Sequence, residues 1–338
     1  MKSRWDALLA RAAGLSTGLL PGSSLDELSR VTDLDDCASR LMRMGVDIPA
    51  EGASLVARLE HGIRRFSAAP VRILASWGRP DPEPVLIFLR DEDRRSLRRL
   101  SRGALAGRPS ARRLSGLIPT VTLPERILGS LARCSSIAEI GRMLVAWGNP
   151  FGSPLLALGS DPRPDPLAVE TALDRRWAEL GRADARRVGG EFLRYVEDSI
   201  DFANARSLLV LIPRQGGGEA AGFFLDGGRR LDRAGYLELA KLPNLDELLS
   251  ALKRRLAGSA FAHALVLSGE SLTRFEDVLL REQVREATRR ARLEPLGGAS
   301  LLRFLLRLRV QVVAVSRAVW GCALAAPPSL DGSWEELR

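Results

Sequence analysis

Cysteine and histidine are both scarce in this sequence of 338 residues. The three cysteines, Cys37, Cys134 and Cys322, lie far apart and form no C-x-x-C motif, so neither a disulfide framework nor a zinc ribbon is expected. A reducing compartment fits this usage. The two histidines, His61 and His263, stand alone in expected helices, and we interpret both as structural. The sequence therefore predicts no metal site and no cofactor.

Motifs that carry catalysis are missing as well. The sequence holds no HExxH, GxSxG or EF-hand pattern. The glycines at 216–218 are not followed by the Lys-Ser or Lys-Thr pair of a phosphate-binding loop, and the glycine pairs at 189–190, 227–228 and 297–298 are equally bare. We interpret these glycines as turns and helix ends. We therefore expect no catalytic residue, no small-molecule substrate and no enzyme activity in this chain.

No apolar run is long enough to cross a bilayer, which takes ~20 residues. The best candidate, 310–328, is interrupted by Gln311, Ser316 and Arg317 and ends in two prolines. An Arg near the middle of a span costs ~2.5 kcal/mol or more, so this segment predicts a buried core helix. Residues 1–20 make a poor signal peptide and predict an amphipathic helix instead.

Aromatic residues make up only 5% of the chain, and lysine occurs only three times, so 47 of the 50 basic residues are arginine. Leucine, alanine and arginine, all strong helix formers, dominate instead, which predicts an all-α fold. The net charge of +9 could attract nucleic acid, anionic lipid or an acidic protein. A general preference for arginine over lysine is the favoured interpretation of this charge.

Two sequence patterns recur at the same distance along the chain. The segment 131–140, LARCSSIAEI, returns as 239–248, LAKLPNLDEL. A polar pattern upstream of each segment recurs at an identical interval; its members are Asp93, Ser96 and Arg98 in the first copy and Asp201, Asn204 and Arg206 in the second. Two patterns with one spacing indicate an internal repeat.

A third copy of the polar pattern lies in 304–321, at nearly the same interval again, where its positions hold Gln311, Ala314 and Ser316. The chain ends before 131–140 could recur a third time. The N-terminal segment 28–37, LSRVTDLDDC, matches that missing piece, so we expect it to pack on the third copy. A linear array does not need such an exchange, whereas a closed ring does, because each unit must cover its neighbour's apolar face.

The expected fold is therefore all-α, with three pseudo-threefold helical repeats closed into a ring around an axial cavity. The expected units are 1–150, 151–262 and 263–338, with 1–45 partly completing the third unit. An open array of three helical hairpins is the alternative.

Two groups of polar residues are candidates for contacts. Asp201 and Asn204 are neighbours on one helix face, while Arg206 points elsewhere. These three residues, like Asp93 and Arg98, either serve a partner near the axial cavity or hold one repeat to the next, and we favour the packing role.

Arg95, Arg99 and Arg102 fall at i, i+4 and i+7, so they form one basic stripe on a helix. The stripe is either a contact for acidic residues or lipid head groups, or a solvated face. Nucleic-acid binding would favour interleaved aromatic residues, which are missing here.

These residues resemble the C subunits of the V/A-type (vacuolar-type) ATP synthases, the relatives of the d subunit of eukaryotic V-ATPase. The second unit matches best, through Tyr195, Asp201, Asn204 and Arg206. The first unit retains Asp93, Arg98 and a Leu-Ile-Pro segment at 117–119, and the opening RWDALLARAAGLSTGLL is similar to the family's first helix.

The resemblance implies a funnel-shaped, non-catalytic rotor adaptor. Such an adaptor sits on the membrane ring of proteolipid subunits and receives the central stalk, made of the D and F subunits, in its cavity. It is a peripheral protein on the cytoplasmic face of the membrane. Two other classes remain open from the residues alone: a basic helical scaffold that binds RNA or DNA, and a degenerate hydrolase.

Overall fold

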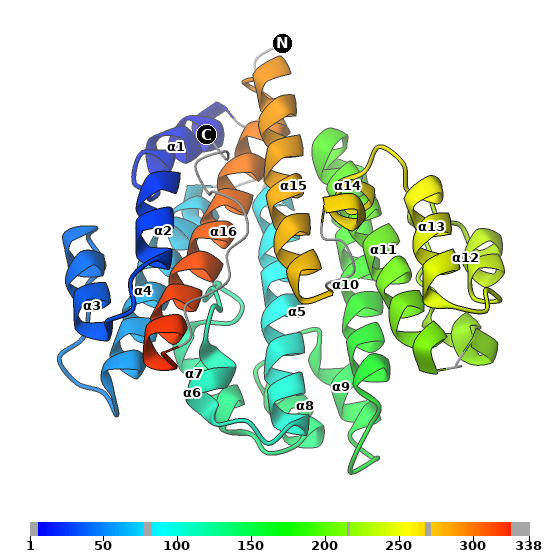
Figure 1. Cartoon of the computed structure of the whole chain (residues 1–338), viewed down its shortest axis with the longest axis horizontal. Coiled ribbons are helices and arrows are strands. Elements are labelled where there is room, and N and C mark those ends of the chain that lie inside the picture. Colours follow the sequence, from blue (N-terminus) through cyan, green and yellow to red (C-terminus); the bar gives the residue numbers. More distant parts are fainter. Residues whose placement is uncertain (1–5, 78–82, 215–216, 268–271, 326–338) are drawn as a thin grey trace. The chain divides into compact units, whose positions relative to one another are not determined.

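A computed structural model describes residues 6–77, 83–214, 217–267 and 272–325. Every regular element within these ranges is a helix, which confirms the all-α expectation (Figure 1). The chain divides into two compact units: residues 1–134 with 287–338, and residues 135–286. The first unit thus combines both ends of the sequence. The three expected repeats stay a prediction.

The first unit is built from eight helices in the part of the chain that is described. They are α1 (Asp6–Ser16), α2 (Gly22–Ser29), α3 (Leu34–Arg43), α4 (Leu55–Trp77), α5 (Glu83–Leu105), α6 (Ser110–Leu114), α7 (Glu125–Arg133) and α16 (Gly298–Ala323). Helix α1 buries one face through Leu8, Leu9 and Ala12, as expected for an amphipathic helix.

Helix α16 is the packing centre of this unit. It contacts α1, α2, α3 and α4, with α2 and α4 beside it in Figure 1. Leu305, Leu308 and Val319 are fully buried, so the expected core helix is confirmed as far as its described residues reach; 326–328 lie outside them. Helices α2 and α3, which include residues 28–29 and 34–37, both contact α16; that this segment completes a third repeat stays a prediction.

The second unit contains the remaining helices. They are α8 (Ile137–Ala146), α9 (Gly152–Leu158), α10 (Pro166–Val188), α11 (Gly190–Leu211), the 3₁₀ helices η1 (Ile212–Arg214) and η2 (Gly217–Phe223), α12 (Arg233–Leu239), α13 (Leu245–Arg255), α14 (Ala260–Leu267) and most of α15 (Leu272–Leu293). Helix α11 ends at Leu211, and the chain continues directly into η1.

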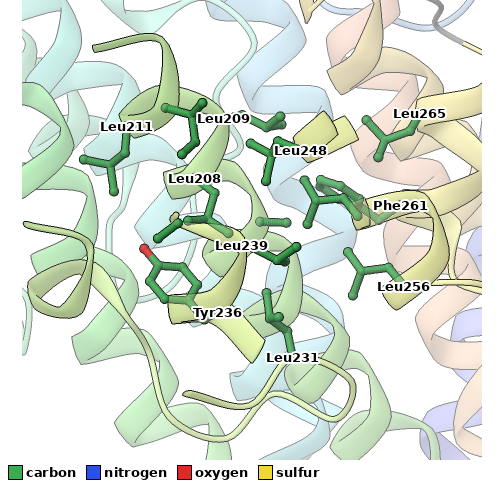
Figure 2. Packing of buried hydrophobic residues seen from close by; sticks show 14 of the residues in the cluster. Leu208, Leu209, Leu211, Leu231, Tyr236, Leu239, Leu248, Leu256, Phe261 and Leu265 are labelled. Atoms are coloured by element: carbon green, nitrogen blue, oxygen red, sulfur yellow. The ribbon is translucent and has the colours of Figure 1, made fainter. Parts of the chain in front are cut away.

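The core of the second unit gathers around α11. Leu208 on α11, Tyr236 on α12, Leu248 on α13 and Phe261 on α14 are all nearly or fully buried in one cluster (Figure 2). The ring of Phe261 stacks on Phe202, with ring centroids 5.2 Å apart. Helical spacing of apolar residues on four helices therefore produces a single core.

Helices α8 and α9 approach each other closely because glycine lines their contact. A Cβ at Gly152 would lie 2.6 Å from the backbone nitrogen of Val145, and a Cβ at Gly141 would lie 2.6 Å from that of Leu156. Only glycine permits such an approach of two backbones. The close contact of α8 with α9 therefore depends on the absence of a Cβ at Gly141 and Gly152.

Candidate functional site

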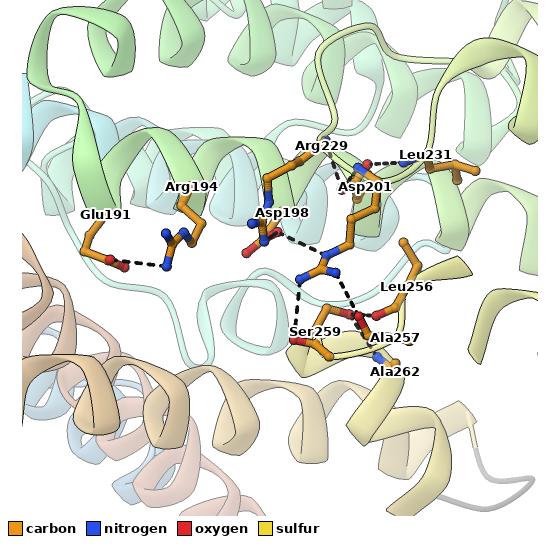
Figure 3. A network of polar contacts seen from close by, with 12 residues as sticks. Glu191, Arg194, Asp198, Asp201, Arg229, Leu231, Leu256, Ala257, Ser259 and Ala262 are labelled. Carbon is orange, nitrogen blue, oxygen red and sulfur yellow. Dashed lines mark hydrogen bonds and ion pairs between the residues drawn. The ribbon is translucent and has the colours of Figure 1, made fainter. Parts of the chain in front are cut away.

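The carboxylate of Asp201 fastens a loop to helix α11. It is fully buried and accepts three backbone N–H groups, from Arg229 (3.1 Å), Arg230 (2.9 Å) and Leu231 (3.0 Å) (Figure 3). A Cβ at Gly228 would stand 2.0 Å from Oδ1 of Asp201. Gly227 lies in a turn, as expected, and Gly228 after it leaves room for the carboxylate.

Asp93 has the corresponding place on helix α5. The hydroxyl of Thr120 donates to its Oδ1 at 2.6 Å and the hydroxyl of Thr122 donates to its Oδ2. The N–H of Leu123 in turn donates to Thr120 Oγ1 at 2.8 Å. Asp93 thus holds the backbone at Leu123 through one intervening hydroxyl, where Asp201 holds Leu231 directly.

Gln311 on helix α16 holds the N-terminal segment. Its Oε1 accepts the N–H of Leu20 at 2.7 Å, and both residues are buried. The thiol of Cys322 donates to the carbonyl of Val31 at 3.1 Å and adds a second bond between α16 and this segment. Gln311 stands where the other two copies have aspartate, and its amide oxygen accepts a backbone N–H as Asp201 does.

Leu20, Leu123 and Leu231 share one structural place. Each is buried and stands directly before the N-cap of a short helix, namely α2, α7 and α12. We call the groups that hold them, Asp93, Asp201 and Gln311, the three anchors. A long helix therefore fastens the start of a short helix three times in this chain.

Each of the helices α2, α7 and α12 is followed by a second short helix, namely α3, α8 and α13. This second helix begins in the same way each time. Its N-cap residue lies thirteen positions after the anchored leucine in all three cases. The cap side chain accepts the N–H of an acidic residue three positions on; the pairs are Asp33 with Asp36, Ser136 with Glu139, and Asn244 with Glu247. This is the capping arrangement that starts a helix and places negative charge in its first turn.

Asn204 and Arg206 complete the contacts of α11. The amide of Asn204 donates to the carbonyl of Leu225 at 2.9 Å and accepts its N–H at 2.8 Å. Arg206 reaches Glu170 and Asp174 on α10, each at 3.0 Å. In the first copy Ser96 is buried and Arg98 is half-buried. Asn204 therefore fixes the segment at Leu225 to α11, and Arg206 ties α11 to α10.

The basic stripe on α5 reaches the surface along part of its length. Arg99 and Arg102 are exposed, while Arg95 is half-buried. The guanidinium of Arg99 extends toward Gly116, because Nη1 would lie 3.5 Å from a Cβ at that glycine. The two exposed arginines are one turn apart on the face that the spacing predicts.

Burial governs the ionisation of the two acidic anchors. It raises the pKa of Asp93 to about 7, against the hydrogen bonds from Thr120 and Thr122, which lower it. Burial likewise raises the pKa of Asp201 to about 6, and the three N–H donors limit the rise. Desolvation disfavours the charged carboxylate, whereas hydrogen bonds to it favour the charge.

A buried charge cluster joins α5 to α16 and was not expected from the sequence. Arg309 on α16 donates to Asp91 at 2.7 Å and also to Glu92, and Arg94 pairs with Asp91. All four side chains are less than a tenth exposed. Because 217 positions separate Arg309 from Glu92, only the fold brings these charges together.

Neither a metal centre nor a membrane span is found in the part of the chain that the structure describes. Within 6–77, 83–214, 217–267 and 272–325, no three His, Cys, Asp or Glu side chains are grouped so that they could hold a metal ion. None of the helices in those ranges combines the length and the apolar character that crossing a membrane requires. His263 approaches Glu282 at 3.7 Å, and all three cysteines are reduced and buried.

Fold and site define an all-helical protein in which polar side chains of long helices fasten the starts of short helices. The chain belongs to the ATP synthase (C/AC39) subunit family, whose model matches residues 8–312. The resemblance to the C subunits of V/A-type ATP synthases is thereby confirmed.

A similar protein is the C subunit of the A-type ATP synthase of Haloquadratum walsbyi (strain DSM 16790 / HBSQ001). It is 24% identical over 225 residues, which cover 65% of this chain and 64% of that protein. The chain thus spans less than two thirds of the length of this relative in the match.

Proposed function

We propose that this chain is the non-catalytic rotor adaptor of a V/A-type rotary ATPase or ATP synthase. In this role it couples the central stalk, made of the D and F subunits, to the membrane ring of proteolipid subunits, and so transmits torque between ion flow and ATP chemistry. It lies as a peripheral protein on the cytoplasmic face of the membrane. Family membership supports the assignment of this chain to an ATP synthase complex, and the arrangement of the three anchors supports its mechanical role.

The observation that carries the proposal is the bond between Gln311 and Leu20. The first two anchors hold a leucine that follows them by about thirty positions, whereas the third holds a leucine from the opposite end of the chain. This exchange is what a closed ring of three helical repeats requires. Such a ring, funnel-shaped in the proposed role, leaves an axial cavity that can receive a shaft without any chemistry.

The exposed stripe on α5 is the proposed electrostatic contact of the adaptor. Complementary charge between partners sets docking register and association rate more than final affinity. Reversing Arg99 and Arg102 (R99E/R102E) should weaken capture of the stalk or the ring at low salt. The loss should be smaller at high salt, where screening has already removed the attraction. The fold should persist, because exposed charge changes usually alter stability by only ~0.5 kcal/mol.

The test is a pull-down of purified D–F and of detergent-solubilised proteolipid ring by the wild-type chain and by R99E/R102E. Capture of both partners by the wild-type chain supports the adaptor. Failure to capture either partner, together with DNA or RNA binding that falls steeply with salt, would favour the nucleic-acid scaffold that the net charge suggests. If R99E/R102E captures both partners normally at low salt, the stripe is a solvated face and the ring argument stands alone.

A further inference from the structure

Two arginines on α16 have no counter-charge among the residues that the structure describes. Arg303 and Arg307 are half-buried and lie one helical turn apart. Neither guanidinium forms a hydrogen bond or an ion pair with another described residue. Burial and the neighbouring charge of Arg303 lower the pKa of Arg307. This pair differs from the arginines at 206 and 309, which are held by carboxylates at 3.0 Å or less.

The start of α16 is a separate source of positive potential, one to two turns before the pair. Helix α16 begins at Gly298 and has no acidic residue in its first turn. The exposed N–H groups of a helix start carry partial positive charge and favour anions. Like charges at i and i+4 also repel each other. The carboxylate of Glu294 packs against the N-cap residue, Gly297, so the positive potential of the pair comes from the two guanidinium groups themselves.

Comparison with the other long helices indicates that the fold does not require this pair. The interval that relates Gln311 to Asp201 places Leu193 and Glu197 of α11 at the equivalent positions. The same relation on α5 gives Val85 and Leu89, both buried. An apolar pair and a leucine–glutamate pair thus serve the same helix positions, so arginine at both is a feature of α16 alone.

We propose that Arg303 and Arg307 form a docking site for an acidic face on a helix of a partner protein, with carboxylates one turn apart. The proposal rests on the rotor-adaptor role, and that role makes the partner the central stalk. Four residues of helix rise by about 6 Å, so two carboxylates at i and i+4 match the two guanidinium groups in spacing. Each guanidinium offers a planar fork that fits a carboxylate with two hydrogen bonds.

A protein carboxylate fits this pair better than a phosphate surface does. Membranes and nucleic-acid duplexes are broad anionic surfaces that draw on fully exposed basic residues. A half-buried guanidinium instead needs a ligand small enough to reach between neighbouring side chains. Burial also weakens screening by salt, so a matched carboxylate there binds in a defined place rather than diffusely.

The experiment measures binding of purified D–F to the full-length chain at 50 and 500 mM salt. The R303E/R307E variant should bind at least about tenfold more weakly at the lower salt, because reversal turns attraction into repulsion. The control variant K253E/R254E makes the same change in net charge on exposed residues of α13 and should bind within about twofold of wild type. The neutral R303Q/R307Q variant should also bind more weakly while its melting temperature does not fall.

Three outcomes would overturn the inference. The first is equal weakening in R303E/R307E and K253E/R254E, which would reduce the effect to net charge. The second is a lower melting temperature in R303Q/R307Q, which would make the arginines structural. The third is loss of binding to phosphatidylglycerol vesicles or proteolipid ring with D–F binding unchanged. If the wild-type chain binds neither D–F nor the ring, the proposed function fails; if wild type and R303E/R307E bind D–F equally, only this inference fails.

Discussion

Asp93 is a carboxyl group that the fold buries and that two threonine hydroxyls hold. Its pKa of about 7 lies well above its ordinary value of 3.8, so the folded state binds a proton that the unfolded state releases. Between these two pH values the folded protein carries more bound protons. Stability therefore falls as pH rises from about 4 to about 7, at a rate of up to about 1.4 kcal/mol per pH unit for one group.

The variant Asp93→Asn tests this pH dependence. Asparagine can still accept one threonine hydroxyl and carries no charge, so the free energy of unfolding should change less between pH 5 and pH 8 than in the wild type. Urea denaturation at pH 5, 6, 7 and 8 measures it. The control Asp47→Asn alters an exposed side chain and should keep the wild-type slope. A wild-type slope in Asp93→Asn would contradict the role given to its burial.

Spacing in the sequence located the polar residues of the helices but not their partners. An interval shared by two patterns identified Asp93 and Asp201, because an internal repeat preserves the position of a buried group along a helix. Nothing in the sequence indicated that Thr120 and Gly228 contact the anchors, because a hydroxyl or a missing Cβ shows this role only once the fold places a carboxylate against it. The cluster around Arg309 was equally hidden, because charge pairing across 217 positions is a property of the fold.

At the scale of elements, the chain places its short helices by different means. Anchored leucines and capping side chains set where α2, α7 and α12 and their following helices begin. The α8–α9 hairpin depends instead on close backbone contact at Gly141 and Gly152. The content of leucine and alanine was enough to predict that these segments are helices. The close crossing of α8 with α9 could not be predicted, because a glycine in the sequence is equally typical of a turn.

The variant Gly152→Ala tests whether the α8–α9 hairpin depends on the close backbone contact. Its Cβ would lie 2.6 Å from Val145 N and 2.9 Å from the carbonyl carbon of Leu144, and backbone cannot yield as a side chain can. We expect a loss of ~1–3 kcal/mol in the free energy of unfolding, measured by urea denaturation. The control Gly129→Ala on α7 meets nothing within 4 Å and should gain ~0.5–1 kcal/mol from reduced chain entropy. Equal effects of both variants would argue against the close crossing.

At the scale of the molecule, the two ends of the sequence depend on each other. Helices α2 and α3 pack on α16, and Gln311 Oε1 accepts a hydrogen bond from the N–H of Leu20. Family membership could be anticipated from the polar patterns and was confirmed by the family match. The contact of the N-terminal helices with α16 was also expected, because the third copy of the sequence pattern lacks a segment that 28–37 resembles.

The variant Gln311→Ala should loosen the N-terminal helices before it unfolds the protein. It leaves the N–H of Leu20 buried without an acceptor, at a cost of ~1–3 kcal/mol. Hydrogen exchange should accelerate in α2 and α3 more than in α11 to α13. The control Gln283→Ala removes a half-buried amide of α15 that has no hydrogen bond to another described residue and should leave exchange in α2 and α3 unchanged. If hydrogen exchange in Gln311→Ala accelerated equally in all these helices, Gln311 would not stabilise the N-terminal helices specifically.

The bond between Leu20 and Gln311 also sets an order of events on the ribosome. The two residues are 291 positions apart, so at ordinary translation speeds the first helices wait about 15–60 s for α16. During that interval α2 and α3, which carry the buried residues Leu28 and Leu41, lack their contact with α16. Nascent chains that stop before α16 should therefore expose the α16-facing side of α2 and α3 to chaperones and proteases until α16 is made.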